Sequence, residues 1–337
     1  MIKPIHECII NKKTSNKPVW FMRQAGRYLP EFRDIRKKNP NFIDLCLNKN
    51  LVPEITLQPL KRFKHLDAAI IFSDILMIPY GLGQEVQFKK DFGPILNTID
   101  INKIEKTNEV DFTRILLPVY ESMKIISKNE IINNKDLIGF VGAPWTLLVY
   151  MLNKKSPKKE IDKEILKNKS LIKDLLNIID KFTKIHIKNQ VKNGATLIQI
   201  FDSWAGLLKN DNEISELIYS PTRSLVDYVR SLNVPVICFP RNIKNYELYC
   251  KIVSPDVISI DYETDPKNIL KKINIPIQGG LDPKVLLAEK DILKKEAIKY
   301  LSIFKDHPYI FNLGHGVLPE TKPDTIEYLV NLVKDFK

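Results

Sequence analysis

The sequence predicts an α/β protein that folds as a distorted (β/α)8 barrel of the TIM type, in one domain over residues 1–337 with a short N-terminal extension. Short, almost continuously apolar segments alternate with longer amphipathic ones along the chain. Strands of a parallel sheet have this character because helices cover both faces. No internal repeat or low-complexity linker divides the sequence, and α/β barrels of about 250 residues or more are common as single domains.

Eight segments have the length and composition of buried strands. In 67–72 and 196–201, for example, apolar residues dominate and a polar residue follows within two positions. A longer excursion, 83–135, separates the second predicted strand from the third. The predicted strands are 18–22, 67–72, 138–142, 196–201, 234–239, 256–260, 275–278 and 308–313.

Helical patterns fill several of the intervals. Over residues 161–193 apolar side chains recur every three or four positions, which predicts a long helix that Gly194 terminates. Ser220, followed by a proline, predicts the cap and first turn of another helix. Pro323 predicts the start of the last one.

Glycine is scarce, with 12 residues in the whole chain against the ~7% of average proteins. Barrel proteins bind ligands in the loops at the C-terminal ends of their strands. The glycine distribution therefore predicts a backbone that turns tightly around a ligand there. The glycines at or just beyond the predicted strand ends are Gly26, Gly81, Gly83, Gly139, Gly142, Gly206, Gly279, Gly280, Gly314 and Gly316.

The formal charge of +12 favours anionic partners. The excess is mostly lysine without interleaved aromatic residues, so no nucleic-acid partner is predicted. The longest uncharged run, 137–153, contains glycine and proline and is shorter than the ~20 apolar residues of a membrane span. It predicts a buried strand and turn, and no membrane partner.

The N-terminus lacks the apolar core of a secretory signal, and the four cysteines form no CxxC pair. Together these features predict reduced thiols and a cytoplasmic location. His6 and Cys8 form a His-x-Cys, but in an unpatterned N-terminal segment, so no metal site is predicted.

Two arginines, Arg23 and Arg27, flank Gly26 directly after the first predicted strand. The planar guanidinium fork suits carboxylates and phosphates, which makes this pair a candidate anion site. The alternative is a pair of surface arginines that form ion pairs with Glu31 and Asp34.

Other strand ends carry polar groups as well. Asp74 places a carboxylate after an apolar strand, or caps the next helix. Tyr150 contacts a ligand or belongs to the core, and Ser203 binds an anion or caps a helix. His315 stands between two glycines, and we expect it to contact a ligand. The histidines expected on solvated helix or loop faces are His65, His186 and His307.

The motifs of nucleotide-binding loops, nucleophile elbows and HExxH metalloproteases do not occur in the sequence. The candidate site thus combines two arginines with a carboxylate, a tyrosine, a serine and a histidine, without a cofactor-binding motif. Such a set can bind a multiply carboxylated substrate and move protons.

Several segments resemble the uroporphyrinogen decarboxylase family. PVWFMRQAGRYLPE at 18–31 and GFVGAPWT at 139–146 are similar to its two signature segments. Three further blocks match in the same order, and the resemblance extends over nearly the whole chain, from about residue 15 to residue 330. Those blocks are 70–76, 278–283 and 312–316.

This resemblance implies a homodimeric barrel enzyme of haem and tetrapyrrole biosynthesis, a carboxy-lyase. The family removes the four acetate carboxylates of uroporphyrinogen III as CO2 and yields coproporphyrinogen III, with no metal or organic cofactor. Arg23, Arg27 and Asp74 are the implied catalytic residues. The implied substrate contacts are Arg23, Gln24, Ala25, Gly26, Arg27, Asp74, Tyr150, Ser203 and His315.

The chemistry of the reaction gives these residues roles. Loss of CO2 leaves a carbanion, and a pyrrole protonated at a ring carbon can accept its electrons. On the resemblance, Asp74 accepts hydrogen bonds from the pyrrole N–H groups and stabilises the positive charge of the transition state, by about 3–4 kcal/mol. Arg23 and Arg27 hold carboxylates, and the proton donor is left unassigned because arginine is a weak acid.

Four positions depart from the family pattern, and none of them is an implied contact: Trp204, Arg241, Tyr262 and Gly280. Two other functions are considered. One is a tetrapyrrole-binding protein without catalysis, although a binder of carboxylates gains little from Asp74. The other is a zinc- and cobamide-dependent methyltransferase-like barrel, which needs a His-x-Cys and a distant cysteine that the strand ends do not offer.

Overall fold

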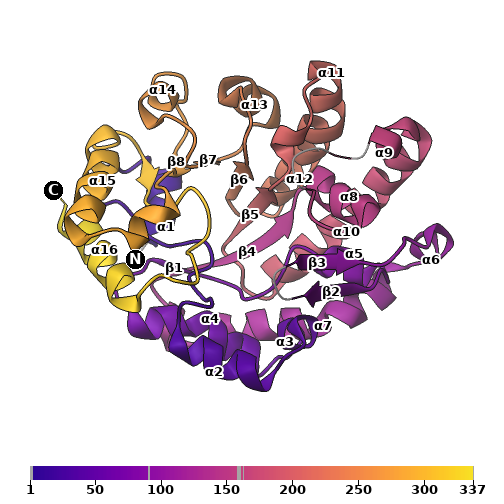
Figure 1. Cartoon of the computed structure of the whole chain (residues 1–337), viewed down its shortest axis with the longest axis horizontal. Helices are drawn as coiled ribbons and strands as arrows, with labels where there is room; N and C mark the ends of the chain where they lie inside the picture. Colours follow the sequence, from indigo (N-terminus) through magenta and orange to yellow (C-terminus); the bar gives the residue numbers. More distant parts are fainter. Residues whose placement is uncertain (1–2, 90–91, 158–160, 162, 337) are drawn as a thin grey trace.

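The computed structural model describes residues 3–89, 92–157, 161 and 163–336, in which helices surround a central parallel sheet (Figure 1). The sheet has seven strands in the order β1-β4-β5-β6-β7-β8-β9, and every neighbouring pair is parallel. Its strands are β1 (Ala68–Ile70), β4 (Asp136–Gly142), β5 (Leu197–Asp202), β6 (Val236–Pro240), β7 (Val257–Ile260), β8 (Ile277–Gly279) and β9 (Tyr309–Ile310). The (β/α)8-type fold class is confirmed.

The predicted strand at residues 18–22 is only a bridge. Val19 pairs in parallel with Phe311, and the Phe311 N–H donates to Pro18 O at 2.8 Å. On the other side, the Asp67 N–H donates to Val19 O at 2.9 Å. The Val19 N–H donates instead to the Asp67 side chain, at 2.7 Å. The Asp67 carboxylate thus takes the place of a main-chain acceptor of a neighbouring strand. The segment around Val19 occupies the eighth position of the ring, between β9 and β1.

Helices connect the strands in sequence. The excursion at 83–135 contains an antiparallel hairpin, β2 (Val86–Lys89) and β3 (Gly93–Leu96), and then α6 and α7. The helices are α1 (Pro4–Ile10), α2 (Pro30–Lys38), α3 (Phe42–Cys46), α4 (Leu51–Arg62), α5 (Met77–Gly81), α6 (Ile101–Glu105), α7 (Glu109–Ser127), α8 (Pro144–Asn153), α9 (Lys163–Lys167), α10 (Lys169–Lys192), α11 (Asp211–Ile214), α12 (Ser220–Ser231), α13 (Tyr246–Val253), α14 (Pro266–Leu270), α15 (Lys290–Ile303) and α16 (Pro323–Asp335).

Most predicted helix boundaries agree with the structure. Gly194 follows the end of α10 with a φ of 115°, and Pro323 begins α16. The predicted cap at Ser220 is wrong, because a π-helical turn over Ser215–Tyr219 leads directly into α12. The Ser220 hydroxyl donates to Ser215 O at 2.9 Å, inside a continuous helical segment.

One prediction about histidines is also wrong. His186 is buried rather than solvated, and its Nδ1 lies 3.0 Å from the Tyr120 hydroxyl. Burial lowers the pKa of His186 to about 3, so the ring is neutral. The periodicity of α10 does not separate this position from its polar neighbours.

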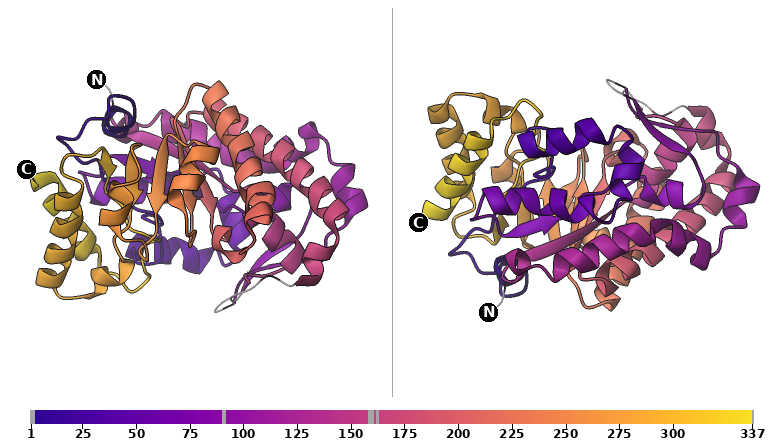
Figure 2. Two further views of the ribbon diagram at one scale, coloured as in Figure 1. Left: turned by 90° about the horizontal axis from the view of Figure 1, so that it is seen from above. Right: turned by 90° about the horizontal axis from the view of Figure 1, so that it is seen from below.

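The barrel interior is filled by side chains of one parity from each strand. Helix α1 adds apolar residues to this inner cluster and closes the end of the barrel where the strands begin. His6 on this helix lies 2.8 Å from Asp136, at the start of β4. The views in Figure 2 place α1 and the β2–β3 hairpin on opposite sides of the molecule. The inner cluster comprises Ile5, Cys8, Ile9, Trp20, Met22, Ala68, Ile70, Ile138, Leu197, Ile237, Phe239, Val257 and Ile310.

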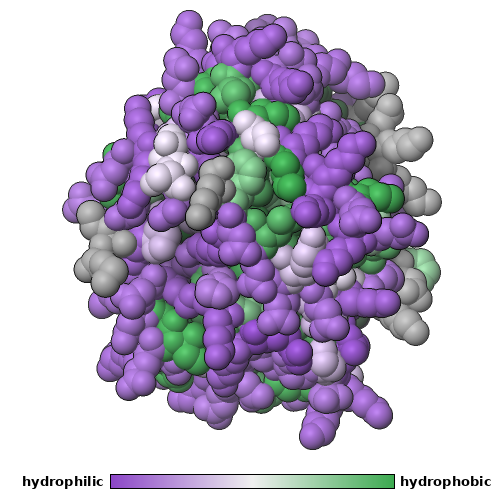
Figure 3. Space-filling model, turned by 90° about the vertical axis from the view of Figure 1, so that its left-hand side faces the viewer, coloured by the Kyte–Doolittle hydropathy of each residue, from purple (hydrophilic) through white to green (hydrophobic). Residues whose placement is uncertain are grey.

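Hydrophilic side chains cover most of the face formed by α15 and α16 (Figure 3). In the described part of the chain, the helices are too short or too polar to cross a membrane.

Candidate active site

The loop after Val19 presents Arg23 in a strained conformation. Arg23 has a φ of 62°, in the left-handed region that residues with a Cβ rarely adopt. Gln24 holds this conformation: it is fully buried, and its Nε2 donates to Ala68 O at 2.9 Å. Its Oε1 accepts from the Phe21 N–H at 3.1 Å, and its main-chain oxygen accepts from the Tyr28 hydroxyl. Because these groups are engaged within the protein, the geometry supports a positioning role for Gln24 rather than the predicted contact.

The rest of the loop offers free donors. The main-chain N–H groups of Ala25, Gly26 and Arg27 have no acceptor within the described chain. A Cβ at Gly26 would lie 2.7 Å from Arg23 O, so the turn requires glycine. Free N–H groups between two guanidiniums suit an anionic group of a ligand.

The alternative of surface ion pairs does not hold for the two arginines. Glu31 pairs with Arg62 at 2.9 Å. The Arg23 and Arg27 side chains are exposed to solvent and have neither a hydrogen bond nor an ion pair with any residue that the structure describes. Desolvation lowers the pKa of Arg23, the charge of Asp74 opposes this shift, and the charge of Arg27 adds to it.

Asp74 lies between β1 and α5 and is partly exposed. Its Oδ1 accepts the Leu76 N–H at 2.8 Å, so the helix-capping alternative holds in part, as a local turn before α5. The second oxygen has no partner among the described residues. Burial raises the pKa of Asp74 to about 6, while the Leu76 N–H and the charge of Arg23 oppose the shift. One carboxylate oxygen is therefore held in place and the other is available to a ligand.

Tyr150, on α8, is buried at 9% exposure. Its ring packs edge-on against Trp204, with centroids 5.9 Å apart. Burial raises the pKa of Tyr150, the Ser156 hydroxyl 3.5 Å away opposes the shift, and the charges of Asp74 and Arg23 also act on it. Tyr150 therefore belongs both to the core and to the electrostatic surroundings of the candidate site.

Ser203 directly follows β5. By the alternation of the strand, Ser203 is on the same face as Leu197, Gln199 and Phe201, which faces the barrel interior. It is partly exposed. Its hydroxyl has no hydrogen bond within the described chain, and the next helical turn takes Trp204 as its cap residue. The helix-cap alternative for Ser203 is therefore wrong.

His315 follows β9 and is partly buried. Burial and, to a smaller extent, the charges of Arg23 and Arg241 lower the pKa of His315 to about 3. The imidazole is neutral at physiological pH, so it can donate one hydrogen bond and accept another.

The glycines beside His315 allow close packing. A Cβ at Gly314 would lie 2.2 Å from the Tyr262 N, and one at Gly316 would lie 2.4 Å from Arg23 Cδ. Gly314 has no room for a side chain because its close neighbours are backbone atoms, whereas a side chain at Gly316 would displace Arg23. The loop after β9 therefore packs directly against the loop after β7 and against Arg23.

Arg241 was not predicted as a contact, although its charge acts on both Arg23 and His315. It directly follows β6, where Ile237 and Phe239 point into the barrel. The alternation of a strand places Arg241 on that same face. This parity was the signal in the sequence that could have identified it.

Three phenylalanines line the barrel interior beside these groups, one each from β4, β5 and β6. The rings of Phe140 and Phe201 lie 5.5 Å apart edge-to-face, and those of Phe201 and Phe239 lie 6.3 Å apart. Phe140 and Phe201 are only partly buried. They offer an apolar surface next to the charged groups.

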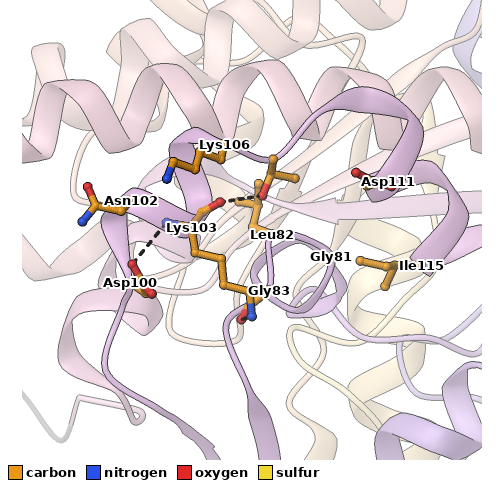
Figure 4. A pocket seen from close by; sticks show the side chains of 10 residues that line it. Gly81, Leu82, Gly83, Asp100, Asn102, Lys103, Lys106, Asp111 and Ile115 are labelled. Atoms are coloured by element: carbon orange, nitrogen blue, oxygen red, sulfur yellow. Dashed lines mark hydrogen bonds between the residues drawn. The ribbon is translucent and has the colours of Figure 1, made fainter.

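A separate surface pocket of about 480 Å³ lies between α5, α6 and α7 (Figure 4). None of the predicted site residues lines it. Two of its charged groups already have partners: Asp100 accepts the Lys103 N–H at 3.1 Å, and Lys103 Nζ donates to Gly83 O at 3.1 Å. This pocket is not part of the candidate site.

Within the described residues, no group of three or more His, Cys, Asp and Glu side chains is placed to hold a metal ion. Cys8 is buried in the inner cluster, at the opposite end of the strands from Asp74 and His315. The four cysteines, all of them in described segments, are free thiols.

The fold and this set of side chains define the class of protein: an α/β-barrel enzyme with cationic groups, a neutral histidine and the Asp74 carboxylate at the C-terminal ends of its strands. A sequence model described as "Uroporphyrinogen decarboxylase (URO-D)" matches residues 3–336. The chain belongs to the uroporphyrinogen decarboxylase family, a family of carboxy-lyases, as the resemblance indicated.

The relatives agree over nearly the full length. The chain is 43% identical to a uroporphyrinogen decarboxylase of Rickettsia felis, over 97% of this chain and 96% of that protein. It is 41% identical to one of Rickettsia bellii, over 97% of each. Among solved structures, a methyltransferase from Methanosarcina mazei superposes with a TM-score of 0.78 at 16% identity, over 98% of this chain and 97% of that one. That likeness concerns the fold alone.

Proposed function

We propose that this protein removes the four acetate carboxylates of uroporphyrinogen III as CO2 and yields coproporphyrinogen III, without a metal or organic cofactor. One observation in the structure carries the proposal within the family. Asp74 is partly buried, has one free oxygen and lies near the Arg23 guanidinium, on which the charge of Arg27 also acts, and neither arginine has a carboxylate partner in the described chain. This arrangement suits a ligand that presents N–H donors at its centre and carboxylates at its rim.

Asp74 is the catalytic centre of this proposal. Its free oxygen accepts hydrogen bonds from the pyrrole N–H groups, while the Leu76 N–H holds the other oxygen. When a ring carbon of the pyrrole is protonated, positive charge develops beside the carboxylate and is stabilised by it. The acetate C–C bond then breaks, CO2 leaves, and the bonding electrons pass into the protonated ring. Protonation of the resulting methylene carbon gives the methyl group, and release of the proton first added to the ring carbon restores the pyrrole.

The other residues bind and orient the substrate. Arg23 and Arg27 bind rim carboxylates, with the free N–H groups of the intervening turn as additional donors. Neutral His315 and Ser203 contribute further hydrogen bonds, and the partly buried phenylalanines accommodate the apolar part of the macrocycle.

An anaerobic assay with the reduced substrate tests the proposal. The purified protein is incubated with uroporphyrinogen III, and the products are oxidised and separated by their number of carboxylates. We expect conversion to the four-carboxylate product by the unmodified protein and loss of conversion in Asp74→Asn. Tight binding of the substrate without CO2 release would instead favour a tetrapyrrole-binding protein. Stoichiometric zinc in active protein would favour the methyltransferase-like alternative.

We further expect a homodimer in the cytoplasm. The dimer rests on the resemblance to the family, and sedimentation of the purified protein tests it directly. Three of the four free thiols are buried, which suits a reducing compartment.

A further inference from the structure

The candidate site contains a third guanidinium whose partner is missing. Arg241 is partly buried, and its Nε is fully enclosed without an acceptor. The side chain has no ion pair with any residue in the described segments. A buried N–H without an acceptor is costly, so most such groups in native proteins have a partner. A carboxylate of a ligand would supply one, through the paired N–H groups of the guanidinium edge.

The strand order places Arg241 across the barrel from Arg23. Around the ring of seven strands and the bridged segment at Val19, β6 lies four positions from Val19 in either direction. Arg23 follows the bridged segment and Arg241 follows β6. The charge of Arg241 nevertheless acts on Arg23 and on His315. The two arginines therefore follow opposite positions of the ring, yet lie close enough for the charge of one to act on the other.

The backbone of Arg241 is fixed on both sides. Its N–H donates to Asp202 O at 3.0 Å, and its carbonyl accepts the Gly206 N–H at 3.1 Å. The next residue, Asn242, donates its N–H to the Asp261 carboxylate at 2.7 Å. A Cβ at Gly206 would lie 2.4 Å from Asn242 O, so the tight turn depends on that glycine. A turn held this firmly positions the guanidinium before a ligand binds.

The chemistry of the substrate requires cations on more than one side. Every pyrrole ring of uroporphyrinogen carries two carboxylates, so the charges surround the macrocycle. Arg23 and Arg27 come from one loop and serve one side of this rim. We propose that Arg241 is a further substrate-binding residue, whose guanidinium binds a rim carboxylate on the side opposite to Arg23. This inference rests on the proposed function, because that function supplies the ligand.

Three variants test it: Arg241→Gln, Arg241→Lys and, as control, Lys244→Gln, which removes an exposed positive charge from the same loop. With uroporphyrinogen III as substrate, we expect Arg241→Gln to raise KM about tenfold or more, with a smaller change in kcat. Arg241→Lys keeps the charge but loses the planar fork, so its KM should lie between those of Arg241→Gln and the unmodified protein. Lys244→Gln should leave KM unchanged.

A second readout locates the guanidinium without a substrate. Removal of the Arg241 charge should raise the pKa of His315, as measured from its ring signals by NMR, and Lys244→Gln should not. An unmodified protein that releases no CO2 would overturn the proposed function. If the unmodified protein is active, unchanged KM in both Arg241 variants, or a His315 pKa that does not move in Arg241→Gln, overturns the assignment of Arg241 alone.

Discussion

The side chain of Arg23 lies directly against the α-carbon of Gly316. A Cβ built at Gly316 would come within 2.4 Å of Arg23 Cδ and 2.7 Å of its Cγ. The adjacent loops are also joined through the main chain, since the Val317 N–H donates to Met22 O at 2.9 Å. The position of the catalytic arginine therefore depends on a loop almost three hundred residues later in the chain.

Gly316→Ala should displace Arg23 and lower kcat/KM by about 10- to 100-fold, because small misplacements of a substrate-positioning group are expensive. Stability should change little, since the flexible end of an exposed side chain can move aside. Steady-state kinetics and thermal unfolding measure the two effects. In a double-mutant cycle, Arg23→Ala with Gly316→Ala should be no worse than Arg23→Ala alone. Fully additive losses would mean that Gly316 acts through something other than Arg23.

Asp74→Asn should reduce kcat by about 10²- to 10³-fold, the usual loss when one preorganised electrostatic partner is removed. The same substitution should not destabilise the protein at pH 7. The fold raises the pKa of Asp74 from 3.8 to about 6, so the charged form is less favourable in the folded state than in the unfolded state.

The raised pKa of Asp74 makes the free energy of unfolding depend on pH between 3.8 and about 6. The stability that wild-type Asp74 retains when protonated is lost as pH rises from 3.8 to about 6. Thermal unfolding should therefore show Asp74→Asn to be the more stable protein above pH 6, and the difference should disappear toward pH 3.8. A variant that is less stable than the wild type at pH 7 would contradict this account.

The acid limb of kcat/KM should report Asp74, because that parameter follows ionisations of the free enzyme. We expect activity to fall below a pH of about 6 as Asp74 gains a proton. Asp202 provides the control: burial raises its pKa to about 7, and its Oδ1 accepts the Thr146 hydroxyl at 2.6 Å. In Asp202→Asn, the pH at which kcat/KM falls on the acid side should be unchanged. Its movement in that variant would assign the limb to Asp202 instead.

Gln24→Leu should destabilise the protein by about 2–4 kcal/mol, because it leaves Ala68 O and the Phe21 N–H unpaired in a buried site. Denaturant unfolding measures this loss. Activity of the folded fraction should also fall, since Gln24 holds the strained turn at Arg23. Gln24→Glu keeps the acceptor and should lose less stability than Gln24→Leu, and equal losses would argue against the two hydrogen bonds as the cause.

The sequence was sufficient to predict the fold class because the buried strands are continuously apolar. It was insufficient at residues 18–22, where composition cannot indicate that the Asp67 carboxylate replaces a ladder partner. Likewise, periodicity places His186 on α10 but does not reveal the Tyr120 hydroxyl beside it. Both failures concern partners that are distant along the chain.

In the candidate site, too, local sequence pattern identifies some residues, while others depend on partners that are distant along the chain. Asp74 and His315 could be identified because each follows an apolar strand, and strand ends meet at one edge of a parallel sheet. The left-handed backbone of Arg23 could not, since it depends on the buried contacts of Gln24. Arg241 could be identified from the parity of Ile237 and Phe239, whereas the resemblance marks it only as a departure from the family pattern.

With Ile5, Cys8 and Ile9, helix α1 covers the end of the barrel where the strands begin. We therefore expect substrate, CO2 and product to enter and leave at the other end, where Asp74 and His315 lie. A macrocycle that loses its acetates one after another therefore has to turn in place or depart and return, and Asp74, beneath its centre, would meet the same ring of N–H groups after each quarter turn.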